Sequence, residues 1–117
     1  MKYVIDRIPP SNNRYIGRTN FREYQKAKKE WAELIYWTCI PRPEKPISRA
    51  VVKLTYFFPT RGRRDPDNYS GKMILDGLTA AGIIEDDSFG HIELILRGGY
   101  DKDHPRTEIE VMPQERR

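Results

Sequence analysis

The strongest constraint on the fold is the nine-residue run AVVKLTYFF at 50–58. β-Branched and aromatic side chains dominate it, a composition typical of a strand packed within a sheet. Three prolines, Pro41, Pro43 and Pro46, precede the run and form a stiff connector, and a basic turn at 59–64 follows it. The chain is therefore expected to build a sheet around this strand.

Two helices and three shorter strands are predicted around it. The segment 21–38 is expected to be helical because one stripe collects Phe21, Tyr24, Ala27, Trp31, Leu34, Ile35 and Thr38. A second helix is predicted to begin at Asp67 or Asn68, both good N-caps, and to stop at Gly82. Strands are predicted at 3–5, 91–97 and 107–112, with a turn over 98–106. The order β-α-β-α-β-β predicts an α/β protein of the α+β type, with a single mixed sheet and two main helices in one domain over 1–117.

Charge is unevenly distributed along the chain. Residues 1–64 contain 15 Lys and Arg against 5 Asp and Glu, whereas residues 65–117 contain 6 against 12, so balances of +10 and −6 give the net +4. A basic half favours a polyanionic partner, most commonly nucleic acid. Charges that mix on a solvated surface would give the same composition, so charge alone leaves the partner open.

Two further features bear on location. No segment approaches the roughly 18 consecutive apolar residues of a membrane helix, so no membrane association is expected. The only cysteine, Cys39, stands among Trp37, Thr38 and Ile40 and is interpreted as a packing residue. A single cysteine fits a reducing compartment, and we expect a cytoplasmic protein.

Acidic residues cluster at two points near the middle of the chain. Asp65 and Asp67 flank Pro66, which disfavours helical angles at the residue before it, so both carboxylates are expected on one side of an extended segment. Asp86 and Asp87 stand at the entrance to the next predicted strand. If that strand pairs with 50–58, the loops are expected to bring the four acids together. Hard oxygen ligands favour Mg²⁺ or Mn²⁺, and such a cation beside a basic surface suits phosphodiester hydrolysis.

Simpler interpretations exist for each of these residues. Asp67 would also serve as a helix cap, and 86–88 as an ordinary turn after a helix. Lys72 would either reach a phosphate or form an exposed ion pair with Asp76, four residues on. An EF-hand loop is rejected, because Ser70 replaces its glycine and Asp76 its final glutamate.

Several motifs together resemble the RusA family of Holliday junction resolvases. They are PPSNNRY at 9–15, RDPDN at 64–68, the segment from Lys72 through 76–84, and DDS at 86–88, in the family's order over nearly the whole chain. The resemblance implies a homodimeric mixed α/β protein, whose essential, Mg²⁺-binding acids fall on Asp65, Asp67 and Asp87 and whose functional lysine falls on Lys72. One extra residue near 70–71 precedes that lysine, and at a helix start it would rotate Lys72 by about 100°.

The function expected on this basis is a Mg²⁺-dependent endodeoxyribonuclease, with Mn²⁺ as an alternative ion, that resolves four-way DNA junctions by paired symmetric nicks in recombination and repair. Asp86 is a candidate additional metal ligand. The residues expected to contact DNA are Arg61, Arg63, Arg64, Asn13 and Arg14. The alternatives are a nuclease acting on flaps or other branched nucleic acids, a non-catalytic junction-binding protein, and a structural or regulatory dimer.

Overall fold

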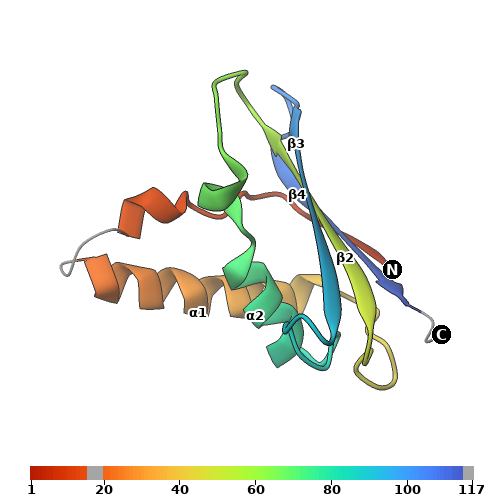
Figure 1. The fold of residues 1–117 in the computed structure, drawn as a ribbon. Coiled ribbons are helices and arrows are strands. Elements are labelled where there is room, and N and C mark those ends of the chain that lie inside the picture. The colour runs from red at the N-terminus through yellow and green to blue at the C-terminus, as the bar shows by residue number, and fades with distance from the viewer. Residues whose placement is uncertain (16–19, 115–117) are drawn as a thin grey trace.

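A computed structural model describes residues 1–15 and 20–114. A four-stranded mixed sheet is covered on one face by two helices (Figure 1), which confirms the predicted class and the order β-α-β-α-β-β. The elements are β1 (Lys2–Ile5), α1 (Phe21–Thr38), β2 (Ala50–Phe58), α2 (Lys72–Ala80), β3 (Ile92–Tyr100) and β4 (Arg106–Pro113), with 3₁₀ turns η1 (Asn12–Tyr15) and η3 (Pro66–Tyr69).

The sheet order is β1-β4-β2-β3. β4 runs antiparallel to both β1 and β2, whereas β2 and β3 are parallel, with Ala50 opposite Ile92 and Phe58 opposite Tyr100. β3 is therefore an edge strand, nine residues long. Because β2 and β3 are parallel, the segment that leaves β2 and the segment that enters β3 lie at opposite ends of the sheet.

The core lies between the sheet and the helices. Alternate β2 side chains from Ala50 to Phe58 are buried against Trp31 and Ile35 of α1 and the apolar face of α2. Cys39 is fully buried in this core, as its interpretation as a packing residue requires. None of the helices in 1–15 and 20–114 combines the length and apolar character needed to cross a bilayer.

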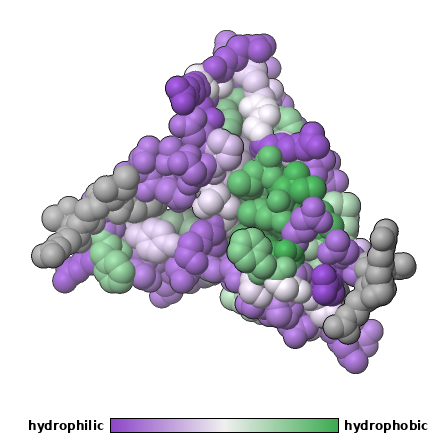
Figure 2. Space-filling view, viewed as in Figure 1, coloured by the Kyte–Doolittle hydropathy of each residue, from purple (hydrophilic) through white to green (hydrophobic). Residues whose placement is uncertain are grey.

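An apolar surface patch lies over the edge strand. Figure 2 shows it as a green area in the region that β3 occupies in Figure 1. It includes the half-buried Ile92, Leu94 and Leu96 and the fully exposed ring of Phe89. The patch therefore extends from the edge strand β3 onto the loop that precedes it.

Two predicted boundaries are wrong. The second helix begins at Lys72, not at Asp67 or Asn68, because η3 takes up Pro66–Tyr69 and Gly71 then adopts a left-handed conformation with φ of 81°. β3 continues to Tyr100, over the first three residues of the turn predicted at 98–106, because its whole length pairs with β2. The helix stop is as predicted, since Gly82 follows α2 with φ of 77°.

Candidate active site

The first pair of acids lies in the loop between β2 and α2, which we call the acid loop (residues 65–71). Asp65 is extended, with φ of −103° and ψ of 139°, and its backbone carbonyl accepts a hydrogen bond from the Asn68 N–H at 3.0 Å. The Asp65 carboxylate pairs with Arg63, whose Nε lies 3.2 Å from Oδ1. Asp67 is exposed and does not cap α2, whose N-cap position is held by Gly71. The simpler interpretation of Asp67 as the helix cap is therefore wrong.

The three arginines before the acid loop differ in their surroundings. Arg64 shapes the turn, because its guanidinium donates hydrogen bonds to Thr60 and Gly62 and lies 4.3 Å from the centre of the Phe58 ring. The Arg61 guanidinium stacks on Tyr100 at 4.1 Å, while the Arg63 side chain is 89% exposed. Arg63 therefore presents positive charge next to Asp65, Arg61 presents its charge at the end of β3 on Tyr100, and the guanidinium of Arg64 is engaged within the turn.

Aromatic side chains form the wall behind the acid loop. Tyr56, Phe58 and Tyr69 pack with ring centres 5.1–6.1 Å apart and line a small cleft together with Asp65 and Leu96. Burial raises the pKa of the Tyr56 phenol, which therefore stays neutral at physiological pH. This packing fixes the position of the acid loop relative to β2 and β3.

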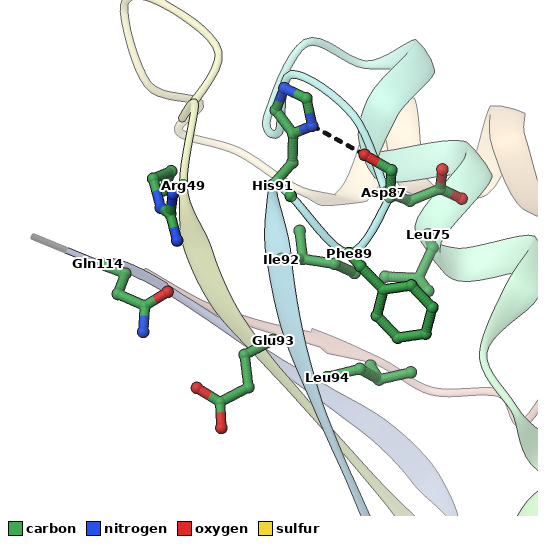
Figure 3. A pocket seen from close by; sticks show the side chains of 11 residues that line it. Arg49, Leu75, Asp87, Phe89, His91, Ile92, Glu93, Leu94 and Gln114 are labelled. Atoms are coloured by element: carbon green, nitrogen blue, oxygen red, sulfur yellow. Dashed lines mark hydrogen bonds between the residues drawn. The ribbon is translucent and has the colours of Figure 1, made fainter. Parts of the chain in front are cut away.

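The second pair of acids lies in the loop that enters β3. The Ser88 hydroxyl lies 2.9 Å from His91 Nδ1 (Figure 3), and that same nitrogen is 3.7 Å from the Asp86 carboxylate. A hydrogen bond from Ser88, reinforced by the backbone N–H of Asp87, lowers the pKa of Asp86, so this carboxylate is ionised at neutral pH. Asp87 lies on the border of an open cavity that Phe89 also lines (Figure 3).

The two pairs of acids do not meet within one chain. Asp65 and Asp67 follow the carboxyl end of β2, whereas Asp86 and Asp87 precede the amino end of the parallel β3. The nine residues of α2, about 13 Å of helix, lie between them in the chain. Across the described ranges 1–15 and 20–114, no three Asp, Glu, His or Cys side chains are grouped so that they could hold a metal ion. The expected strand pairing is present, but its parallel direction keeps the four acids apart.

Lys72 opens α2 directly after the acid loop. Its side chain is 63% exposed, and its Nζ lies 3.7 Å from the Asp76 carboxylate. Lys28 of α1 lies 3.5 Å from the same oxygen, so one carboxylate attracts two ammonium groups. The Lys72–Asp76 ion pair of the simpler interpretation is therefore present. Its length of 3.7 Å exceeds that of a hydrogen bond, so the exposed Lys72 ammonium is able to turn toward a phosphate.

The N-terminal motif contacts the acid loop through Asn12, a residue that the sequence pattern did not single out. Asn12, and not Asn13, contacts this loop: its side-chain amide donates to the Asp67 carbonyl at 3.0 Å and to Ser70 Oγ at 3.2 Å. Asn13 is exposed, and Arg14 lines a surface hollow together with Arg7 and Lys26. No sequence signal links residue 12 to residue 67, because 55 positions separate them.

Comparison with known protein families gives a match over most of the chain. The profile of a family described as endodeoxyribonuclease RusA matches residues 7–112. The matched span includes the N-terminal motif, the acid loop, Lys72 and the loop with Asp86 and Asp87. No curated protein matches the chain.

Proposed function

Because the chain belongs to the RusA family of endodeoxyribonucleases, we propose that it is a Mg²⁺-dependent enzyme that resolves Holliday junctions by paired, symmetric nicks and acts as a homodimer in recombination and repair. The observation that carries this proposal is the acid loop itself. Two carboxylates, Asp65 and Asp67, stand at the surface beside two arginines whose charges face solvent. Cleavage of a phosphodiester needs this combination of acidic and basic groups.

The donor set fits a hard divalent cation. Asp65 and Asp67 offer carboxylate oxygens in the described part of the chain, with no Cys or His beside them, and Mg²⁺ or Mn²⁺ prefers such ligands. Bound there, the cation would neutralise phosphate charge and act as a Lewis acid. Asp65 would exchange its Arg63 partner for the cation, which frees that guanidinium for DNA. Two carboxylates are few for this task, so a third ligand from elsewhere is expected.

A second copy of the chain supplies the missing acid in our proposal. β3 is an edge strand with unpaired backbone groups along one side. The apolar patch beside it includes Phe89, Ile92 and Leu94, and the Phe89 ring has no cover in a single chain. Pairing two β3 strands edge to edge would bury this patch and join two sheets into one. A twofold axis makes such an interface self-complementary.

The direction of this pairing places the acids. About a twofold axis perpendicular to the sheet, two copies of β3 pair antiparallel, so the start of one strand lies beside the end of the other. The loop with Asp87 precedes Ile92, and the cleft that Asp65 lines is bordered by Gly98 near the other end of β3. Asp87 of one subunit would therefore approach Asp65 and Asp67 of the other, with Asp86 next to it. Each of the two resulting sites would nick one strand.

The remaining residues have roles that follow from their positions. Arg61 and Arg63 flank the acids and would bind the phosphates on either side of the scissile bond, with Arg64 holding the turn that presents them. Lys72 would stabilise the charge that develops on the reacting phosphate. Arg14 and the exposed Asn13 would contact the backbone of a junction arm.

The experiment that tests the function uses a labelled synthetic four-way junction. The purified protein is incubated with the junction, a flap and a plain duplex, each with and without Mg²⁺. Paired nicks at symmetric positions, on the junction only and with metal only, are the expected result. Preferential cleavage of the flap would assign a different branched substrate, and binding without cleavage in Mg²⁺ or Mn²⁺ would overturn the catalytic proposal.

A further inference from the structure

Asn12 makes a bridge between two segments that are far apart in the sequence. η1, which contains Asn12, lies against η3 of the acid loop. The amide nitrogen of Asn12 donates to both the Asp67 carbonyl and Ser70 Oγ, at 3.0 and 3.2 Å. The two acceptors belong to Asp67 and Ser70, and Gly71, whose left-handed turn leads into α2, follows directly.

On the side of the sheet the acid loop is held by the Tyr69 ring and by Gly71, which packs against Leu54, whereas Asn12 restrains it on the side of the N-terminal segment. Asp67 is exposed, and within the described ranges the side chain of Asn12 is the one that hydrogen bonds to its backbone. The bond from the Asn68 N–H to the Asp65 carbonyl shapes η3 from within, and the Tyr69 ring attaches η3 to Tyr56 and Phe58 of β2, but neither contact is a hydrogen bond to the N-terminal segment. The position of Asp67 relative to the N-terminal segment therefore depends on Asn12.

The bridge also joins two charges of opposite sign. Two residues after Asn12 the chain carries Arg14, which lines a surface hollow with Arg7 and Lys26. Glu23 and Glu30 also border this hollow, so three positive and two negative side chains meet there. DNA that lies on this surface is thereby held at a fixed distance from the carboxylates. A loss of the bridge would let the DNA-bound segment and the acids move independently, and a displacement of about 1 Å at a reacting centre can cost up to about a hundredfold in rate.

From this geometry we infer that Asn12 is a positioning residue, which holds the Asp67 carboxylate in register with the DNA-bound N-terminal segment. The inference rests on the proposed nuclease function. Asn12 acts through the backbone of Asp67 and touches neither substrate nor metal. Its loss should lower turnover and weaken the response to Mg²⁺ while junction affinity stays unchanged.

The test compares Asn12→Ala with a matched amide variant, Gln25→Ala, whose side chain is exposed on α1. For Asn12→Ala we expect kcat on the junction to fall about tenfold, KM to stay within about twofold, and the Mg²⁺ concentration for half-maximal rate to rise. The Gln25→Ala protein should match the wild type in all three. A wild-type kcat in Asn12→Ala would overturn the inference, as would a rise in KM alone, which would make Asn12 a DNA contact.

A second measurement needs neither metal nor activity. Hydrogen exchange of the backbone amides in the acid loop should be faster in Asn12→Ala than in the wild type and unchanged in Gln25→Ala. Equal exchange in all three proteins would show that the bridge does not hold the loop and would overturn the inference. If the wild-type protein leaves junctions uncut, the proposed function fails, and this exchange measurement still decides whether Asn12 holds the acid loop.

Discussion

Asp65 and Asp67 are two residues apart but meet different surroundings. Asp65 is paired with Arg63 and borders the aromatic cleft, whereas the Asp67 side chain extends into solvent and has no partner among the described residues. An exposed carboxylate without a partner contributes little to folding. Asp67 is therefore the acid whose replacement separates catalysis from stability most cleanly.

The replacement of Asp67 by asparagine should abolish cleavage while the protein still binds junctions. We expect the nicking rate to fall at least about a hundredfold. Replacement of a residue that only hydrogen bonds to a metal ligand costs up to about a hundredfold, and the loss of the metal ligand itself should cost more. Junction affinity should stay equal or increase, because one negative charge leaves the DNA-facing surface. Nicking assays and gel-shift titrations measure the two effects. The charge-matched control Glu44→Gln should retain wild-type nicking, and an Asp67→Asn protein that cuts at the wild-type rate would disprove the assignment.

At the scale of the elements, features that depend on consecutive residues were easier to predict than features that depend on pairing between distant segments. The helix over 21–38 has the predicted bounds because its apolar stripe is a property of consecutive residues. The predicted start of α2 is wrong. The preference of aspartate for the N-cap position points to Asp67, but a separate 3₁₀ turn and a left-handed Gly71 come before the helix. The parallel direction of β2 and β3 depends on pairing across the sheet, so the separation of the acids could not be read from the sequence.

Gly71 sets the start of α2 and with it the position of Lys72. A Cβ at this position would lie 2.4 Å from Leu54 Cδ1, and φ of 81° is unfavourable for any L side chain. Gly71→Ala should therefore lower the free energy of unfolding by about 2–4 kcal/mol, the sum of backbone strain and overpacking. Gly82→Ala is the matched control, because its φ is 77° and a Cβ there meets nothing within 4 Å. It should cost about 1 kcal/mol. Urea unfolding compares the two, and equal costs would contradict the tight packing of Gly71 on Leu54.

β3 is the element on which the proposed dimer would depend. Phe89→Ser removes the exposed ring before this strand without disturbing the core, since the side chain is fully exposed in one chain. We expect the dimer dissociation constant to rise about tenfold or more, as for an aromatic residue central to an interface. Sedimentation over a range of protein concentrations measures this. Trp37→Ser, an exposed aromatic residue on α1, is the control, and dissociation in that variant alone would move the interface to α1.

At the scale of the whole molecule, the two pairs of acids proposed to share a site lie apart in the described part of one chain. The acid loop lies at one end of the parallel pair β2 and β3, and the loop with Asp87 at the other. The proposed homodimer, related by a twofold axis, would convert this separation into two equal sites, each with acids from both subunits. The same symmetry would place two nicks at matched positions, so the proposed dimer and the proposed paired cleavage would have a common structural cause.

Mixing two inactive variants tests this arrangement directly. Asp67→Asn and Asp87→Asn homodimers should both be inactive, because every site contains a substituted acid. If the sites are shared, a mixed dimer contains one site with both substitutions and one that is intact, so activity returns as single nicks. Random exchange makes half of the dimers mixed, and the nicking rate should reach about a quarter of that of the wild type. If each site belonged to one chain, both sites of a mixed dimer would be defective and mixing would restore nothing. Nicking of a junction labelled on each strand in turn, after the subunits have been exchanged in mild denaturant, separates the two arrangements.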